Sequence, residues 1–386
     1  MKKRMLFLAL ALIVVASLVL AGCSSGTTTK ATSGTTAAPA TSKATTAAAA
    51  TTAAASTTAT ATTPAKVYKL KYADQNSDTG WEGSNAAQPW LNQITEATSD
   101  QVQFETYWAQ TLFKGADAWV STKNGVGDLS WMFHGYWANQ TPLADVMSLP
   151  FLGFKSAEQA SGIFWQLYEK YPTLKEEFSD NHVLLTWASD PYFLITNKKQ
   201  VKTVEDIKGM QIRVPSGPPT EVIKALGAVP VSKGMPDTFL ALQKGEIDGM
   251  AASWEAIVSF KLYEVVKYYT YMPMFEVYFT QAMNNDKWAS LPADIQSEIE
   301  GVSGLEGSLF WGANMFDSAK VEGKRLIQSA GADMTEYTLS DAELAAWQSA
   351  SASVIDAWLQ KMKDAGHPEA QEILDTTREL IQSYNP

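Results

Sequence analysis

Apolar and polar residues alternate along residues 67–73 and again along 101–108, which is the pattern of a strand with one buried face. A helix through Trp90 is expected between these two strands, because the apolar residues there recur at helical spacing. A second helix near 116–124 and a short strand at 126–132 follow. This order of strands and helices predicts a largely parallel sheet flanked by helices.

Residues 210–214 predict another strand, and this one carries a charged side chain. Met210, Ile212 and Val214 alternate with polar residues, so Arg213 should point away from the face that carries those apolar residues. Arg213 also lies near the C-terminal end of the strand, close to the start of the next helix. Ligands bind at that edge of open α/β sheets, and a guanidinium near a helix N-terminus favours a carboxylate or phosphate. Arg213 is therefore a candidate ligand-binding residue.

The chain after Arg213 keeps the same alternation of elements. A helix is expected to begin at Pro218, with Ser216 available as its cap. Strands at 228–231 and 246–250 follow, with a helix over 236–245 between them. The C-terminal third is predicted to be helical: Pro292 and Pro368 begin helices, and Ser340 and Glu343 form a capping box before a third one.

Length and composition narrow the possible functions. A chain of 386 residues suggests two or three domains. Residues 66–386 hold 25 basic and 41 acidic residues, a net charge of −16, which argues against a nucleic-acid partner. One cysteine and three histidines leave little material for a metal site, and we expect neither a metal nor a cofactor.

The sequence lacks the common motifs of catalytic sites. The chain contains no GxSxG, Walker A, HExxH or GxGxxG pattern, and no spacing singles out a pair of acidic residues for acid–base work. An extracellular enzyme is therefore kept only as an alternative, and a binding protein is favoured.

Residues 1–22 resemble a bacterial lipoprotein signal peptide. Three basic residues precede an apolar run of about sixteen residues, which is shorter than a membrane-spanning helix needs. The run ends in Leu20-Ala21-Gly22-Cys23, which is similar to a lipobox, so Cys23 is the expected lipidation site. The alternative is a buried cysteine beside an ordinary signal peptide. The lipidated form predicts a protein anchored on the outer face of the cytoplasmic membrane.

Residues 23–65 predict a tether. Between residues 24 and 65 there are sixteen Thr, fifteen Ala and five Ser, and there is no acidic or aromatic residue. Such a segment buries too little apolar surface to offset its ordering entropy, so we expect it to be disordered. The folded part should then begin near residue 66.

The run IRVPSGPPTEVIKALGAVPVSKGMPDTFLALQKGEIDGM at 212–250 resembles the signature of the solute-binding proteins of tripartite ATP-independent periplasmic (TRAP) transporters, the DctP type. Weaker matches are spread over nearly all of 66–386, and they lie at 109–132, 148–154, 198–209, 260–270 and 330–347.

The resemblance implies an α/β fold of two lobes, like the type II periplasmic binding proteins, with hinge crossovers, a long connecting helix and C-terminal helices. It places lobe 1 at 66–190 with a return segment at about 279–320, and lobe 2 at 191–278, completed by about 321–386. It also implies that the lobes close over a small organic acid and deliver it to TRAP membrane subunits. The alternative partner is an ATP-driven importer, whose binding proteins share the two-lobed form.

In the family, an arginine at the position matched by Arg213 binds the ligand carboxylate; a surface salt bridge to Asp206 or Glu221 is the alternative. Many members carry a second arginine where this chain has Phe193, and a polar run where it has 250–254. These departures favour a monocarboxylate with an apolar or aromatic body. The alternative is that the substituted residues pack against protein.

Pocket walls follow from the same matches. Trp254, Met235 and Phe193 are the candidates from lobe 2. From lobe 1 the family's ligand-facing loops suggest Trp81, Phe133 and His134, of which His134 is either a hydrogen-bond donor to the ligand or a structural residue. Because a buried, unpaired arginine is costly, an open cleft is the expected resting state.

Overall fold

Two β-sheets organise the part of the chain that this computed structural model describes, residues 66–384. The predicted signal peptide at 1–22, the lipidated Cys23 and the tether to residue 65 lie outside the described residues. The first sheet has the order β2-β1-β3-β10-β4, and its strands are β1 (Tyr68–Ala73), β2 (Val102–Tyr107), β3 (Leu129–Phe133), β4 (His182–Ala188) and β10 (Tyr278–Met283).

The second sheet has the order β11-β9-β5-β8-β6-β7. Its strands are β5 (Tyr192–Thr196), β6 (Gln211–Arg213), β7 (Val229–Val231), β8 (Gly249–Ala252), β9 (Tyr268–Phe275) and β11 (Thr335–Thr338). The pairs β1–β2, β1–β3, β6–β7 and β6–β8 are parallel, as the β-α-β order predicts. Strands β10 and β5 run antiparallel to their neighbours, so both sheets are mixed.

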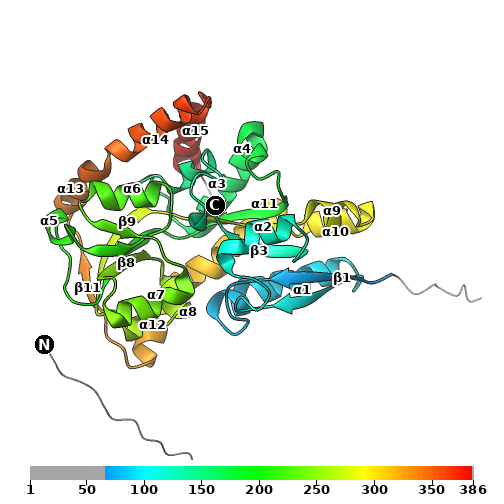
Figure 1. The fold of residues 1–386 in the computed structure, drawn as a ribbon, viewed down its shortest axis with the longest axis horizontal. Helices are drawn as coiled ribbons and strands as arrows, with labels where there is room; N and C mark the ends of the chain where they lie inside the picture. Colours follow the sequence, from blue (N-terminus) through cyan, green and yellow to red (C-terminus); the bar gives the residue numbers. More distant parts are fainter. Residues whose placement is uncertain (1–65, 385–386) are drawn as a thin grey trace, which may run out of the picture. The chain divides into compact units, whose positions relative to one another are not determined.

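Helices cover each sheet (Figure 1). Those around the first sheet are α1 (Gln88–Ala97), α2 (Ala118–Lys123), α3 (Ala157–Lys170), α4 (Pro172–Glu176), α9 (Asn285–Ala289) and α10 (Ala293–Gly301). Those around the second are α5 (Val204–Ile207), α6 (Pro218–Ala225), α7 (Met235–Lys244), α8 (Trp254–Ser259) and α13 (Asp341–Ser351). We call each sheet with its helices the first lobe and the second lobe.

A helical run at 304–329 joins the lobes. It consists of α11 (Gly304–Trp311), the π-helical η6 (Gly312–Asp317) and α12 (Ser318–Ser329). Helix α11 packs on α3 and β4 in the first lobe, whereas α12 packs on α8 in the second. The other short turns are η1 (Gly83–Ala87), η2 (Gly115–Asp117), η3 (His134–Tyr136), η4 (Ala144–Ser148) and η5 (Leu262–Glu264).

Two strand connections also cross between the lobes, from β4 to β5 and from β9 to β10. They run side by side, because the Ser189 backbone N–H donates to the Val277 carbonyl at 2.8 Å and the Val277 N–H donates to the Ser189 hydroxyl at 3.0 Å. The strands of the two sheets come from the segments that the sequence assigns to the two lobes.

The C-terminal helices differ from that assignment. In Figure 1, α14 (Ser353–Asp364) runs from α13 towards α15 (Ala370–Ser383), and α15 lies against α3. The Trp358 indole N–H donates to the Pro142 carbonyl at 2.9 Å, and the Gln159 amide donates to the Ile381 carbonyl at 3.1 Å. The segment after residue 321 therefore packs on both lobes and does not complete the second lobe alone.

Two helix ends have the predicted capping residues, and a third does not. Ser340 and Glu343 form the expected capping box, and Gly245 ends α7 with a φ of 71°. The predicted cap at Ser216 is wrong: Gly217 caps α6 with a φ of 79°, and the Ser216 N–H donates to the Gly135 carbonyl of the first lobe at 2.9 Å. The sharp turn into α6 needs the conformational freedom of glycine, which moves the serine outward to the lobe interface.

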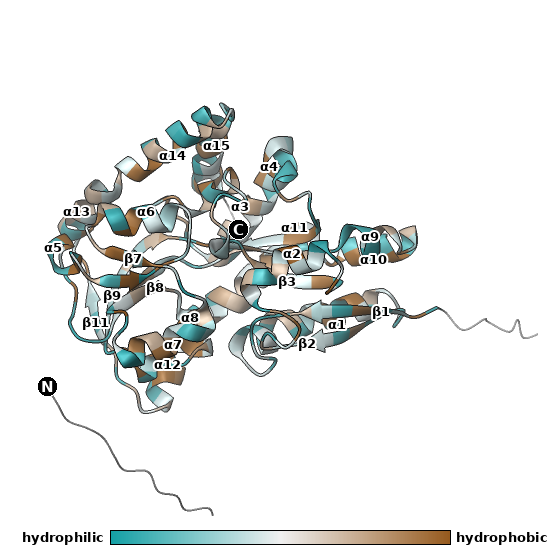
Figure 2. Cartoon of the chain, in the orientation of Figure 1, coloured by the Kyte–Doolittle hydropathy of each residue, from teal (hydrophilic) through white to brown (hydrophobic). Residues whose placement is uncertain are grey.

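Apolar residues gather on the strands, as Figure 2 shows for β7 and β9, while outer helices such as α14 alternate between polar and apolar residues. The buried core falls into three clusters, of which one fills the second lobe beneath α7, α8 and α12. Among residues 66–384, no helix is both long and apolar enough to cross a membrane.

Candidate functional site

Arg213 is buried, with 1% of its surface exposed. Its Nε donates to the Lys233 carbonyl at 3.0 Å, and its Nη1 has no hydrogen-bond partner among the described residues. Burial lowers the pKa of the guanidinium from its ordinary value, yet an arginine stays charged throughout the physiological range. The site therefore contains a buried positive charge with an unused donor.

The alternative interpretation of Arg213 as a surface ion pair does not hold. Asp206 pairs with Lys199 at 3.5 Å, and Glu221 pairs with Lys224 at 2.9 Å. Within residues 66–384, no carboxylate lies within 4.0 Å of Arg213.

Strand register sets the direction of Arg213. It pairs with Met250 on β8, which in turn pairs with Ile195 on β5, so these three side chains lie on one face of the second sheet. Phe193, two residues before Ile195, belongs to the same face. The neighbouring Ile212 belongs to a different core cluster, as the alternation predicts.

Tyr136 lies beside Arg213 and belongs to the first lobe. Its hydroxyl donates to the Gln75 side-chain oxygen at 2.8 Å and accepts the backbone N–H of Met235 at 3.2 Å. Burial raises the pKa of this hydroxyl, and the Arg213 charge partly opposes the rise. Tyr192 on β5 feels the same opposed effects, so both tyrosines lie within electrostatic reach of the guanidinium.

Aromatic rings line the first lobe at this place. Phe133 stacks on Phe279 with ring centres 4.9 Å apart, and Trp187 stacks on the same phenylalanine at 5.1 Å. The ring of Tyr136 meets Phe133 edge-on at 4.8 Å. We call Phe133, Phe279 and Trp187 the aromatic row; their register on β3, β10 and β4 places them directly opposite one another.

Several polar atoms around the aromatic row are buried without a hydrogen-bond partner among residues 66–384. They are the indole nitrogens of Trp131 and Trp187 and the side-chain oxygen of Gln281. Buried polar groups are nearly always hydrogen-bonded, so a group of unpartnered ones together with Arg213 indicates a place that receives a ligand or water.

Three of the buried carboxyl groups are divided between the lobes, two in the first lobe and one in the second. Asp74 follows β1, Glu82 precedes η1 and Glu255 is the second residue of α8. Burial raises the pKa of Asp74 to about 7 and that of Glu255 to about 7, and it raises the pKa of Glu82 well above its ordinary value. Among the described residues, no three His, Cys, Asp or Glu side chains are arranged to hold a metal ion.

His134 lies on the other face of the first sheet from the aromatic row. Its ring nitrogens are 3.0 Å from the Thr280 hydroxyl and 3.4 Å from the Thr141 hydroxyl, and the ring stacks on Tyr278. Burial lowers its pKa to about 3, so the ring is neutral. The structure does not bring His134 together with Arg213, and these contacts favour the structural interpretation of this residue.

Trp254 and Phe193 pack against each other in the second lobe, with ring centres 4.9 Å apart. Trp254 also meets Tyr269 edge-on at 5.3 Å, and the Lys324 ammonium lies 5.5 Å from its ring centre. These contacts all lie within the second lobe and α12. They favour the alternative interpretation, in which Phe193 and Trp254 pack against protein and not against the ligand.

The remaining two candidates occupy the interface. Met235 is 5% exposed and reaches Tyr136 through its backbone N–H. Trp81 is half-buried, and its indole N–H donates to the Met315 carbonyl at 3.0 Å, which ties the helical turn before η1 to η6 of the connecting run.

Sequence reasoning missed Tyr136, Tyr192, Gln75 and the three carboxyl groups. Tyr136 could have been predicted as a site residue, because it lies two residues after His134 in the segment that supplied the candidates Phe133 and His134. Nothing in the sequence separates Glu82 from the other acidic residues.

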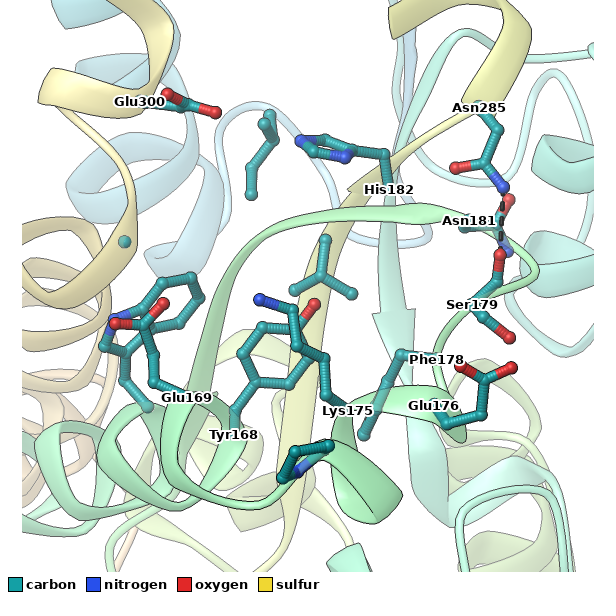
Figure 3. Close-up of a pocket in the computed structure, with 15 residues that line it drawn as sticks. Tyr168, Glu169, Lys175, Glu176, Phe178, Ser179, Asn181, His182, Asn285 and Glu300 are labelled. Atoms are coloured by element: carbon teal, nitrogen blue, oxygen red, sulfur yellow. Dashed lines mark hydrogen bonds between the residues drawn. The ribbon is translucent and has the colours of Figure 1, made fainter. Parts of the chain in front are cut away.

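Figure 3 shows a different hollow, of about 710 Å³, between α3, α4, β4 and α10 of the first lobe. Exposed side chains of both charges line it, including Glu169, Lys175 and Glu300. None of the predicted site residues belongs to it. We therefore assign the candidate site to the interface around Arg213.

Known proteins resemble this chain over most of its length. A TRAP solute-binding protein from Rhodoferax ferrireducens, in complex with copurified benzoate, is 29% identical; the match covers 82% of this chain and 98% of that one, with a TM-score of 0.77. A marine metagenome TRAP protein specific for aromatic acid ligands, with 3-hydroxybenzoate, is 27% identical, covers 83% and 100%, and has a TM-score of 0.78.

Curated proteins also match the chain in sequence. The transporter protein TsaT of Comamonas testosteroni is 22% identical over 75% of this chain and 85% of its own length. Three further curated relatives are matched over 36% to 62% of their own length. The model of the bacterial extracellular solute-binding proteins, family 7 (DctP), matches residues 73–361. The chain therefore belongs to the DctP family of TRAP solute-binding proteins.

Proposed function

We propose that this protein captures a small monocarboxylate with an aromatic or apolar body and holds its carboxylate on Arg213. The observation that carries the proposal is the buried guanidinium, whose Nη1 is unpartnered and which has no carboxylate within ion-pair distance among residues 66–384. A buried charge is costly unless it is paired, so an anion entering the interface compensates a cost that the protein alone leaves in place.

The anion has to be recognised at short range. The net charge of −16 on residues 66–386 repels anions at long range, so affinity must come from a local, desolvated contact. A guanidinium and a carboxylate can form two parallel hydrogen bonds, which gives both energy and orientation.

The aromatic row supports a flat, apolar ligand body. Phe133, Phe279 and Trp187 offer ring faces and edges at the interface with the second lobe, close to Tyr136. Rings stack or meet edge-on at these separations, so a benzoate-like ring suits the site better than a sugar. The similar proteins at 29% and 27% identity, in complex with benzoate and with 3-hydroxybenzoate, support the same ligand class.

The family suggests where the ligand goes. We propose that TRAP membrane subunits receive it, and that Cys23 carries a lipid that keeps the protein on the outer face of the cytoplasmic membrane. Lobe closure accompanies binding in this proposal, because only contact between the lobes brings Tyr136 and the backbone of Met235 together.

Calorimetry with benzoate tests the carboxylate contact. Arg213→Ala should lose about 2–5 kcal/mol of binding free energy, the range for removing one partner of a buried charge pair. Arg325→Ala is the matched control, since Arg325 is exposed and pairs with Glu322 on α12. Equal affinity of wild type and Arg213→Ala would remove Arg213 from the site.

A further inference from the structure

A cavity of about 520 Å³ lies between the lobes, against α14 and apart from the site around Arg213. The first lobe contributes Asn139 and Asp145, the second lobe contributes the residues around the start of α6, and α14 contributes the face that carries Trp358 and Lys361. None of the residues assigned to the carboxylate site lines it. Cavities of this size are typical of sites for small organic molecules.

Asp145 gives the cavity a buried carboxyl group. The side chain is 9% exposed, its Oδ1 accepts the Tyr278 hydroxyl at 2.9 Å, and its Oδ2 accepts no hydrogen bond within residues 66–384. No basic side chain of that range lies within 4.0 Å of it. Burial raises the pKa of this carboxyl group to about 7. A buried carboxylate needs donors to stabilise it, so the free oxygen favours a ligand that brings an N–H group.

Lys361 places a positive charge on the α14 wall. Its ammonium donates one hydrogen bond to the Asn139 side-chain oxygen, which leaves two N–H donors. It has no carboxylate within 4.0 Å in the described part of the chain. The charge of Lys361 opposes the rise in the pKa of Asp145, so the two groups interact electrostatically although they do not pair. The cavity therefore contains two opposite charges that are held apart.

The rest of the α14 wall is apolar. Val354, Trp358 and Lys361 recur at helical spacing, so they share one face of α14. The indole N–H of Trp358 donates to the Pro142 carbonyl at 2.9 Å, which fixes the ring against the first lobe. Pro218, the first residue of α6, adds to the apolar lining. A small apolar group therefore suits the space beside the two charges.

The cavity depends on contact between the lobes, because both of them supply its walls. A Cβ atom on Gly217 would lie 3.0 Å from Oδ1 and 3.2 Å from Oδ2 of Asp145, so the second-lobe backbone lies directly against the first-lobe carboxyl group. The neighbouring Ser216 N–H donates to the Gly135 carbonyl at 2.9 Å. Gly135 immediately precedes Tyr136, so the same contact between the lobes borders both the cavity and the carboxylate site.

We propose that this cavity is a second binding site, which takes an α-amino acid with an apolar side chain. Asp145 accepts the ammonium group, Lys361 donates to the carboxylate, and Trp358 covers the side chain. A zwitterion satisfies both charges at once, whereas a simple amine or acid leaves one of them unpaired. The inference goes beyond the proposed function and leaves the ligand at Arg213 unchanged.

The two sites are coupled in this proposal. Since the walls come from both lobes, the amino acid binds the closed form and stabilises it. It therefore strengthens the binding of the acid at Arg213, and the acid strengthens the binding of the amino acid by the same factor.

The test titrates L-leucine and L-phenylalanine into the protein by calorimetry, with and without saturating benzoate. At least one of them should bind, and at saturation it should tighten benzoate binding about five-fold or more. The matching amine and the matching acid, which lack the carboxylate or the ammonium group, should each bind the benzoate-saturated protein about ten-fold or more weakly, because hydrogen bonds between charged groups are lost.

Variants of the two charged residues locate the site. Asp145→Asn keeps the acceptor for Tyr278, and Lys361→Met keeps the length of the side chain; each should weaken amino-acid binding about ten-fold and remove the effect on benzoate. Asp356→Asn and Lys363→Met, exposed on α14 and outside the cavity, are the matched controls. Thermal melts check folding, and the exposed Lys361 keeps the test decisive if Asp145→Asn does not fold.

The contrary outcomes are distinct. Absence of binding by both amino acids overturns the second site, as does equal binding by wild type, Asp145→Asn and Lys361→Met. Competition between the amino acid and benzoate also overturns it, because it places the amino acid at Arg213. Independent binding of the two ligands overturns the coupling.

The proposed function fails separately. If Arg213→Ala binds benzoate as wild type does, the carboxylate contact is wrong, while amino-acid binding that depends on Asp145 and Lys361 still supports the second site. If benzoate requires Arg213 and no amino acid binds, the second site is wrong and the proposed function stands.

Discussion

The backbone N–H of Met235 in the second lobe donates to the Tyr136 hydroxyl of the first lobe at 3.2 Å. The same hydroxyl donates to Gln75 at 2.8 Å, so one oxygen connects three segments beside Arg213. A contact of this kind exists only when the lobes meet. It couples lobe closure to the residue that we expect to bind the ligand.

Tyr136→Phe should therefore weaken benzoate binding without disturbing the fold. The variant keeps the ring against Phe133 and loses both hydrogen bonds, which should cost about 1–2 kcal/mol, or roughly five- to thirty-fold in affinity. Calorimetry measures the loss, with Tyr68→Phe at the start of β1 as the control. An unchanged affinity would show that the hydroxyl does not contribute to closure.

Arg213→Met should separate binding from stability. Methionine removes a buried charge that has no carboxylate partner in the described chain, so the ligand-free protein should keep its free energy of unfolding or gain up to about 3 kcal/mol. Chemical denaturation measures this quantity, and benzoate should no longer raise the midpoint. A strong destabilisation without ligand would mean that Arg213 holds the fold and is not reserved for an anion.

Stability should fall as the pH rises from about 5 to 8. The pKa of Glu255 is raised to about 7 by burial, so the folded state binds more protons than the unfolded state between the ordinary pKa near 4.5 and 7. The contribution of Glu255 to the free energy of unfolding is complete below the ordinary pKa near 4.5, and it is lost as the pH rises through the folded-state pKa of about 7. The charged neighbour that adds to this rise is Asp74, and the Ser259 hydroxyl opposes it.

The variant Glu255→Gln isolates this contribution. Its unfolding free energy should depend less on pH than that of wild type, by at most about 3 kcal/mol over the interval. The lowered pKa values of His134 and His182 act in the opposite direction, below pH 6.5, and they are common to both proteins. Parallel pH profiles of the two proteins would contradict the burial of an uncompensated carboxyl group at this position.

Fluorescence should report the ligand through Trp187 rather than Trp254. Trp187 stacks in the aromatic row, and its indole nitrogen has no hydrogen-bond partner in the part of the chain that the structure describes, whereas Trp254 packs inside the second lobe. Trp187→Phe should remove most of the change on adding benzoate, and Trp254→Phe should keep it. The reverse result would return the pocket wall to Trp254.

Cys23→Ser should release the protein from membranes if the cysteine is lipidated. The replacement leaves the signal sequence nearly intact and removes the thiol that would carry the lipid. Fractionation of cells, followed by detection of the protein in the soluble and membrane fractions, measures the change. A membrane-bound Cys23→Ser protein would refute the anchor.

The sequence predicted what is local and periodic. The place of Arg213 could be predicted from the sequence. The alternation of residues indicates which face of the strand carries its side chain, and the prolines that follow mark the end of the strand. Strands β9 and β10 escaped prediction because both of their faces are largely buried, which removes the alternation. The cap at Ser216 failed because the contact it makes instead is with Gly135, far away in the sequence.

Contacts between distant segments limit the prediction of the site. Tyr136 and Gln75 are 61 residues apart, and Met235 is 99 residues from Tyr136. At Phe193 and Trp254 the sequence departs from the family pattern, but it does not show which neighbours fill the space. Glu82 was one of 41 acidic residues until the fold enclosed it.

Two of the connections between the lobes run side by side at Ser189 and Val277. A twist there separates the Arg213 side from the Phe133 side without breaking a strand pair in either sheet, because the pairs of each sheet stay within it. Opening then costs the contacts that the two lobes make with each other, and the helical run at 304–329, which packs on both lobes, has to bend with them.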